Sequence, residues 1–196
     1  LESTVEIYGH RIGVDKYGHF ISQGHEMFEA ARHQADFSLA VAKHAARQEE
    51  GLFGRFFSGV KSFGDVNANI EGAEFWASLT EGEHPYFECR GERFARVRDF
   101  SWRDYVTDAW DESINCSGFM PVLKKIVDSN LKTLGMSCPV LPERCKALTE
   151  LPYAEYRVNP SCFVAAGAPL PSWGEVVFET GSGVPLYDED LARLGS

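Results

Sequence analysis

A long stretch of helical periodicity, from Val14 to about Gln48, constrains the fold of this chain more than any other feature. Apolar residues recur in it at spacings of three and four, and polar residues recur out of phase with them, so the two sets lie on opposite sides of a helix. Gly18 and Gly24 each weaken a helix by about 1 kcal/mol relative to alanine, which predicts that another backbone packs closely here. The apolar set is Tyr17, Phe20, Ile21, Gly24, Met27, Phe28, Ala31 and Ala35, and the polar set is Asp15, His19, Ser22, Glu26, Glu29 and His33.

Three further helices are predicted downstream of this stretch. The second runs from about Asp65, its predicted N-cap, to Leu79, and it should bury Asn69 and Gly72. The third runs from Trp102 to about Cys116 and carries an acidic stripe. The fourth starts at Pro121, where a first turn tolerates proline, and ends near Gly135.

The remaining segments predict little regular structure. Residues 86–89 and 93–97 alternate in the way that a small hairpin does. Seven of the nine prolines follow residue 138, which predicts an extended C-terminal wrap with one strand-like piece, Glu175 to Glu179. We therefore expect a mainly α, single-domain bundle of about four helices over residues 1–196, with a helical body at about 14–136 and a proline-rich wrap at about 137–196.

Five cysteines are present, and none forms a Cys-x-x-Cys unit of a zinc site. Cys138 and Cys145 flank a short loop with two prolines, which favours a disulfide between them and a compartment outside the reducing cytosol. The alternative is five small buried side chains in a cytosolic protein. The odd count leaves one thiol free in either case.

The charge balance limits the classes of partner. A formal net charge of −10 argues against nucleic acid as a partner and against docking on anionic lipid, and is easier to reconcile with a neutral or cationic one. No window approaches the roughly 18 consecutive apolar residues that span a bilayer, so we expect no membrane insertion.

Common catalytic motifs do not match this chain. It has no P-loop, no Gly-x-Gly-x-x-Gly after a strand and no Gly-x-Ser-x-Gly elbow. The run from His25 to Glu29 begins like a zincin helix, but Glu29 stands where the second histidine is needed. His25, Glu29 and His33 recur at spacings of four and could hold a divalent metal, although no metal is part of the favoured interpretation.

The first helix offers a set of groups for proton transfer. Asp15 and His19 are one turn apart, so the carboxylate can orient the imidazole, and Glu26 lies two turns further along. If Asn69 is buried, its amide needs partners, from Asp15 and His19 or from the acidic stripe. The alternative is an ordinary surface helix, with Lys16 as a solvated charge.

The acidic stripe of the third predicted helix contains Asp108, Asp111 and Glu112. Carboxylates this close raise one another's pKa, and active sites exploit that effect. A solvated acidic face on an acidic protein is the alternative interpretation.

Three runs together resemble uncharacterised exported bacterial proteins. They are GVDKYGHF at residues 13–20, Asp65-x-x-x-Asn69-x-x-Gly72, and WDESINCS at residues 110–117. The resemblance covers roughly residues 10 to 165. It implies export and a bacterial source, and it carries over no activity and no catalytic residue.

The favoured functional hypothesis is a cell-envelope hydrolase of the lysozyme type acting on cell-wall glycan without a cofactor. Glu26 would be the general acid and Asp108 or Asp111 the second carboxylate, since such chemistry needs two carboxyls roughly 5 to 9.5 Å apart. Asp15 and His19 would orient them, with Asn69 and Glu112 as substrate-binding groups. The alternatives are a metal-dependent hydrolase using His19, His25, Glu29 or His33, and a non-catalytic acidic module that binds a cationic protein.

Overall fold

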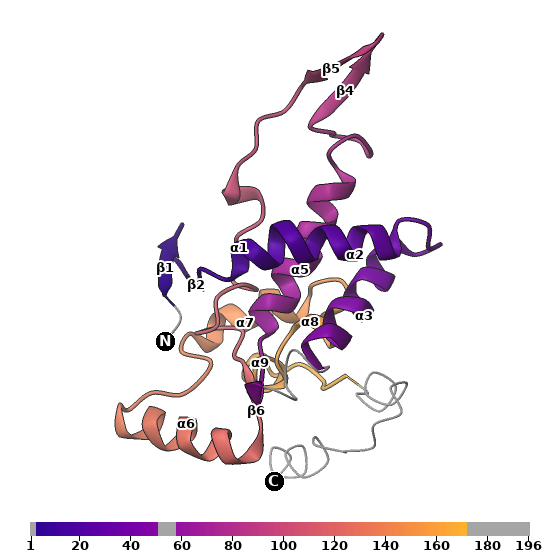
Figure 1. Ribbon diagram of the computed structural model, residues 1–196. Helices are drawn as coiled ribbons and strands as arrows, with labels where there is room; N and C mark the ends of the chain where they lie inside the picture. The colour runs from indigo at the N-terminus through magenta and orange to yellow at the C-terminus, as the bar shows by residue number, and fades with distance from the viewer. Residues whose placement is uncertain (1–2, 51–57, 172–196) are drawn as a thin grey trace.

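The computed structural model describes residues 3–50 and 58–171 and confirms a mainly α fold with small hairpins. The helix α5 (Phe63–Ala77) runs through the middle of the molecule, and the other N-terminal helices pack against it (Figure 1). Because α5 is covered on several sides, its residues from Phe63 to Ile70 are all buried. It contributes to both hydrophobic clusters of the core, through Ala68 to one and through Val66 and Ile70 to the other.

The first predicted helix is interrupted rather than continuous. It consists of α1 (Lys16–Gly18), a π-helical turn η1 (His19–Gln23) and α2 (Gly24–Ala31). A turn then leads to α3 (Phe37–Glu50), whose start is capped by Asp36 Oδ1 accepting from Leu39 N at 2.9 Å. An aspartate that accepts from a backbone N–H three residues later favours a helix start over a helix interior. This preference explains why the helix is interrupted between α2 and α3.

The second helix is confirmed, but its predicted cap is wrong. Ser62 caps α5 by accepting from Asp65 N at 3.1 Å, so Asp65 lies inside the first turn with its carboxylate available to other partners. Asn69 and Gly72 are buried as predicted. Gly24 packs against α5 as expected, whereas Gly18 faces open space, so the prediction of a close contact is wrong for Gly18.

The third predicted helix is wrong beyond its first turn. Only the 3₁₀ turn η2 (Trp102–Asp104) is helical, and a series of turns follows it. In these turns Asp111 Oδ1 accepts from both the backbone and the hydroxyl of Ser113, and Thr107 Oγ1 accepts from Ala109 N. Short polar side chains that bond the nearby backbone compete with helix formation, so no acidic helical stripe exists here.

Short strands and the fourth helix complete the body. The helix α6 (Pro121–Thr133) and the hairpin β4 (Phe87–Arg90) to β5 (Arg93–Arg96) are confirmed. The N-terminal lead-in forms a second hairpin, β1 (Thr4–Ile7) with β2 (His10–Gly13). A two-residue pairing of β3 (Val60–Lys61) with β6 (Gly118–Phe119) holds the start of α6.

The C-terminal segment is pinned by disulfides, but it is not extended between residues 142 and 166. It forms η3 (Pro142–Arg144), α7 (Cys145–Thr149), α8 (Ala154–Arg157) and α9 (Pro160–Ala166). Pro142 and Pro160 stand in the first turns of η3 and α9, where proline is compatible with a helix. The predicted strand at 175–179 lies outside the described residues.

The predicted pairing of Cys138 with Cys145 is wrong. Cys116 pairs with Cys138, and Cys145 pairs with Cys162. The reason is packing: α7 lies against α9, and Cys138 lies beside the 112–116 turns. Cys89 is free and exposed. Two disulfides are typical of proteins in oxidising compartments.

An aromatic cluster ties the first helix to the irregular segment after the hairpin. The fully buried ring of Phe20 lies within 4.9 to 5.7 Å of the ring centroids of Phe75, Trp102, Tyr105 and Trp110. This packing fixes the position of residues 100–110, in which η2 is the one helical turn. Within the described residues no helix is both long and apolar enough to cross a membrane.

Candidate functional site

Polar groups from four segments of the chain meet at one end of α5. We call them the Lys16 cluster. Its members are Asp15, Lys16, His19, Glu49, Asp65, Asn69 and Glu112.

The centre of the Lys16 cluster is a lysine that is almost completely buried. The Lys16 side chain is 1% exposed, and its Nζ lies 2.6 Å from Asp65 Oδ1 and 3.2 Å from both Asp15 Oδ1 and Glu112 Oε1. Burial by itself would lower the pKa of Lys16, but the neighbouring carboxylates outweigh it and raise that pKa above its ordinary value. Lys16 is therefore a fixed positive charge that orients three carboxylates.

Local backbone geometry makes room for this lysine. A Cβ built at Gly64 would lie 2.8 Å from Lys16 Cε and 3.0 Å from the backbone oxygen of Trp110, so a larger residue there would displace the lysine. Ser62, the cap of α5, donates its hydroxyl to Glu112 Oε1 at 2.5 Å and so holds the other side of the cluster.

His19 lies between an amide and a carboxylate. Its Nδ1 is 3.0 Å from Asn69 Oδ1, and its Nε2 is 3.5 Å from Asp65 Oδ2. An amide oxygen accepts only, so this contact places a proton on Nδ1 and directs Nε2 at the Asp65 carboxylate. If Nε2 carries a lone pair, two acceptors face each other, and only a proton or a cation between them makes that contact favourable.

The position of His19 follows from the π-helical turn. His19 is the first residue of η1, and the wider turn places it over α5 beside Asn69. Single π-turns inside helices are frequent at functional sites. The amide of Asn69 is fully buried, and its Nδ2 has no hydrogen-bond partner among the described residues.

Buried carboxylates in the cluster hold protons more tightly than usual. Burial is the largest cause that raises the pKa of Glu49, to about 8, and repulsion by Asp65 adds to it. Burial also raises the pKa of Asp65, against the opposing attraction of Lys16 and His19. Lys16 and Lys61 oppose these effects at Glu49. Asp15, Asp65 and Glu112 are the three carboxylates in contact with Lys16, so the region around that lysine attracts further positive charge.

One subset of the cluster has the composition of a metal site. A ligand atom of each of Asp15, His19 and Asp65 lies within 4.8 Å of the others, the one such group of three found in residues 3–50 and 58–171. Imidazole nitrogen and carboxylate oxygen are each normal ligands of divalent metals such as zinc, iron and manganese. A ligating histidine almost always donates its other ring N–H to an oxygen, as His19 does to Asn69.

The structure brings four of the predicted site residues together and separates the other three. Asp15, His19, Asn69 and Glu112 belong to the Lys16 cluster. Glu26 is on the exposed face of α2, outside it.

Asp108 and Asp111 have other partners. Both Asp108 oxygens accept from Arg144, and His10 Nδ1 lies 2.9 Å from Asp108 Oδ1. Asp111 is buried and accepts from the backbone of Arg11 as well as from Ser113. These contacts tie β2 and η3 to the turn segment.

The predicted metal triad on the first helix does not assemble as a compact group. His25 Nε2 lies 4.0 Å from Glu29 Oε1, and both side chains are more than 40% exposed. His33 follows the end of α2 and is exposed. The pair is therefore an ordinary surface contact between neighbouring turns.

Sequence reasoning missed the roles of Lys16, Glu49 and Asp65. Lys16 was expected in solvent, yet it stands four residues before Phe20 and eight before Gly24, on the buried line of the helix. Glu49 likewise follows the buried positions Ala42 and Ala45 at helical spacings. In both cases the sequence signal is a charged residue at a position of the helical repeat that apolar residues otherwise occupy.

No family model, no curated protein and no solved structure matches this chain.

Proposed function

We propose that this protein is a metal-dependent hydrolase of the bacterial cell envelope, with Asp15, His19 and Asp65 as the metal ligands. The observation that carries the proposal is the joint arrangement of His19. Its Nδ1 is held by Asn69 Oδ1, its Nε2 lies 3.5 Å from Asp65 Oδ2, and one of its ring nitrogens belongs to a compact donor set with Asp15 and Asp65. That combination supplies both the ligands of a divalent cation and the outer hydrogen bond that orients one of them.

A divalent cation at such a ligand set would supply a polarised water as nucleophile near neutral pH. The chain's own groups support that chemistry. Lys16 Nζ contacts Asp65 Oδ1, whereas His19 Nε2 faces Asp65 Oδ2, so the lysine holds the carboxylate in place from the other side. Glu49, with its pKa near 8, is suited to accept and return a proton at neutral pH.

Access to the site is from the side of Asp15 and Glu112. Their side chains are 28% and 38% exposed, whereas those of Lys16, Glu49 and Asp65 are nearly buried. A substrate would approach over these two carboxylates. The negative surface favours a neutral or cationic part of an envelope polymer, in line with the net charge of −10.

Export and a bacterial source are part of this proposal. They are supported by the two disulfides, which suit an oxidising compartment, and by the resemblance of residues 13–20, 65–72 and 110–117 to exported bacterial proteins. The resemblance is notable because its first two runs contain every ligand of the proposed centre.

A metal-free hydrolase is the second candidate, and one observation favours it. Lys16 Nζ, 2.6 Å from Asp65 Oδ1, already supplies a cation to this carboxylate. His19 would then carry a proton on each ring nitrogen and act as a general acid. The lysozyme-type version has less support, because Glu26 is exposed on α2 and Asp108 is engaged by Arg144.

Metal titration separates these candidates. The purified chain, stripped with chelator, is titrated with Zn²⁺ and Mn²⁺ by calorimetry. We expect binding of about one ion per chain, loss of that binding in His19→Ala, and about 10- to 100-fold weaker binding in Asn69→Ala. His25→Ala is the matched control, because it removes an exposed imidazole two turns away.

Activity on isolated envelope polymer is the second readout. We expect chelator to abolish the release of soluble fragments and Glu26→Gln to leave it unchanged. Absence of metal binding, or equal loss in the His19 and His25 variants, would reject the metal centre. Activity that survives chelator but is lost in His19→Ala would establish the metal-free candidate instead.

A further inference from the structure

The helix α6 has an apolar face that nothing in the described structure covers. Among the α-helices of the described residues, α6 alone has no buried residue. Leu123 packs toward Gly59, but Val122 is 72% exposed and Ile126, one turn on, is 54% exposed. Leu134, just after the helix, is 69% exposed.

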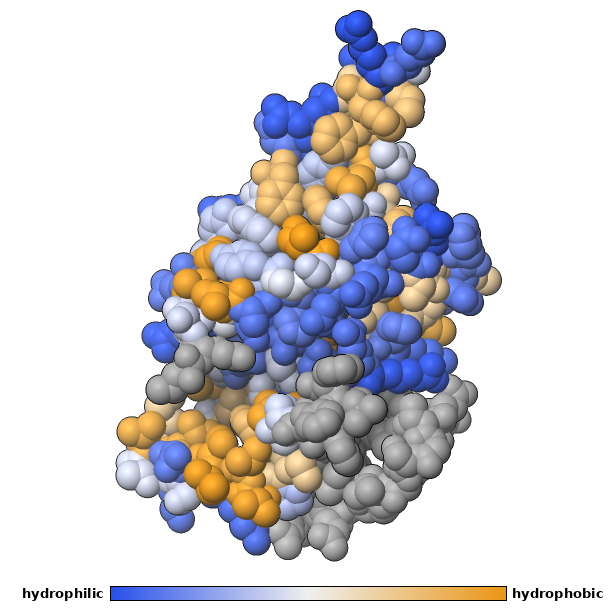
Figure 2. Space-filling view, viewed as in Figure 1, coloured by the Kyte–Doolittle hydropathy of each residue, from blue (hydrophilic) through white to orange (hydrophobic). Residues whose placement is uncertain are grey.

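The exposed apolar residues of this segment coincide with a region of the molecular surface. Figure 2 shows a hydrophobic patch at the lower left, where Figure 1 places α6, away from the other helices. We call it the α6 patch. Its exposed apolar members are Met120, Val122, Ile126, Leu134, Met136, Val140 and Leu141.

The charge around the α6 patch is opposite to that of the whole chain. From residue 113 to residue 142 the charged residues are Lys124, Lys125, Asp128 and Lys132, three positive against one negative. A chain of net charge −10 therefore carries a local excess of two positive charges beside its apolar patch. The whole-chain charge, which argued against docking on anionic lipid, does not describe this surface.

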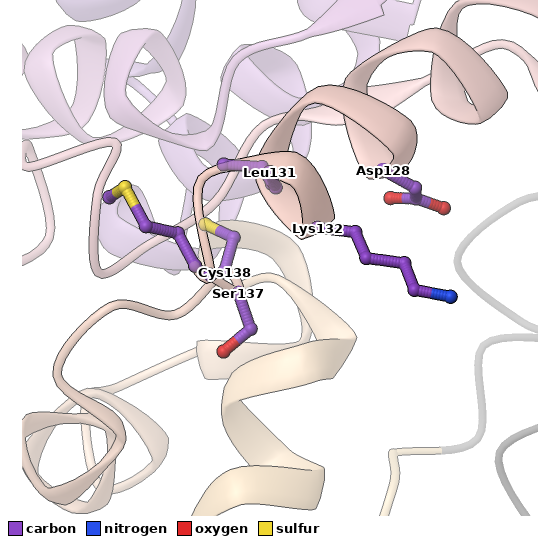
Figure 3. A pocket seen from close by; sticks show the side chains of 7 residues that line it. Asp128, Leu131, Lys132, Ser137 and Cys138 are labelled. Carbon is purple, nitrogen blue, oxygen red and sulfur yellow. The ribbon is translucent and has the colours of Figure 1, made fainter.

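Contacts at both ends hold α6 in place. Met120 N donates to Gly59 O at 2.8 Å at its start, and the Cys116–Cys138 disulfide fastens the segment after its end. A hollow lies at the C-terminal end, lined by Leu131, Met136 and Cys138 among others, and Figure 3 shows Lys132 and Asp128 extending from the same side of α6. Lys124 Nζ donates to Asp128 Oδ2 at 2.8 Å, so Lys125 and Lys132 are the lysines of α6 that remain for other partners.

We propose that α6 docks this protein onto the surface of an anionic lipid bilayer. The helix lies parallel to the surface, with Val122 and Ile126 entering the boundary between headgroups and acyl chains and the lysines contacting lipid phosphates. An amphipathic helix with lysines beside exposed aliphatic residues is the usual form of such an interfacial element. With 13 residues, α6 is too short to span the bilayer.

Charge complementarity favours lipid over a second copy of the chain. A symmetric dimer through this face would place one lysine-edged patch against another, and like charges across an interface are unfavourable. An anionic bilayer satisfies both the apolar residues and the lysines. This inference is independent of the Lys16 cluster, since no residue of that cluster lies in the patch.

Vesicle co-sedimentation of the full chain tests the proposal. Vesicles of phosphatidylcholine are compared with vesicles in which about one lipid in three is phosphatidylglycerol. We expect binding to the anionic vesicles that weakens with salt. Lys125→Glu should reduce it at least about fivefold and Ile126→Ser about tenfold.

Matched controls are Lys146→Glu on α7 and Val164→Ser on α9, both exposed and outside the patch. Each should bind vesicles like the parent chain. Far-UV circular dichroism and thermal unfolding check that all variants fold, which is expected because the altered side chains are exposed. Equal binding to both vesicle types, equal effects of the control variants, or a concentration-dependent dimer with no vesicle binding would overturn the proposal.

Discussion

Gly24 of α2 lies directly against Gly72 of α5. A Cβ built at Gly24 would lie 2.6 Å from the Gly72 Cα, and a Cβ at Gly72 would lie 2.1 Å from the backbone oxygen of Phe20. The two helices therefore meet backbone to backbone. This contact brings η1, with His19 at its start, within hydrogen-bond distance of Asn69, which is one turn before Gly72.

Gly24→Ala should destabilise the protein by about 1–3 kcal/mol, because the added methyl meets backbone atoms that cannot rotate away. Gly18→Ala is the matched control. It lies in the same helical segment, but a Cβ there meets nothing within 4 Å, so it should be neutral or stabilising by about 0.5–1 kcal/mol. Urea unfolding measures both free energies. Similar effects of the two substitutions would contradict the backbone contact.

The pH dependence of stability should reveal the buried carboxylate of Glu49. Burial and the neighbouring Asp65 raise its pKa from 4.5 to about 8 in the folded state, so the folded chain binds this proton more tightly than the unfolded chain does. The stability linked to Glu49 is therefore fully present below about pH 4.5 and is lost as the pH rises through about 8.

Glu49→Gln should flatten that decline and make the protein more stable than the parent by about 1–3 kcal/mol at about pH 9. Glu26→Gln, which removes an exposed carboxylate, should leave the profile unchanged. Unfolding free energies measured across this pH range check the prediction. Because other groups also titrate here, the difference between parent and variant is decisive, and parallel profiles of the parent and Glu49→Gln between about pH 5 and pH 9 would contradict the raised pKa of Glu49.

Removal of the Cys145–Cys162 disulfide should cost about 3 kcal/mol, because its 17-residue separation defines a loop of moderate length in the unfolded chain. The double variant Cys145→Ser, Cys162→Ser is compared with Cys89→Ser, which alters the exposed free thiol and should change stability by less than about 0.5 kcal/mol. Thermal unfolding with and without reductant gives the difference. Labelling of the unreduced protein at any cysteine other than Cys89 would contradict the pairing.

Local signals in the sequence were sufficient for the elements that depend on local interactions. The periodicity of about residues 65–79, the proline at the start of α6 and the alternation of the β4–β5 hairpin each predicted an observed element, with α5 beginning and ending two residues earlier than predicted. The prediction of the third helix was wrong for a reason that is also local. Thr107 and Asp111 accept from the backbone N–H groups two residues later, and the pattern of apolar residues does not account for that competition.

The sequence by itself thus determined the mainly α class and the burial of Asn69 and Gly72 in α5, and it favoured a disulfide over free buried cysteines. Only the tertiary structure decided which cysteines pair, that Lys16 is buried, and that Asp15, His19 and Asp65 meet while Glu26 stays apart. The physical reason is that helix periodicity specifies which face of a helix is buried, but not which partner covers it. The close approach of Gly24 to Gly72 selects that partner, and it brings together charges that are about fifty residues apart in the chain.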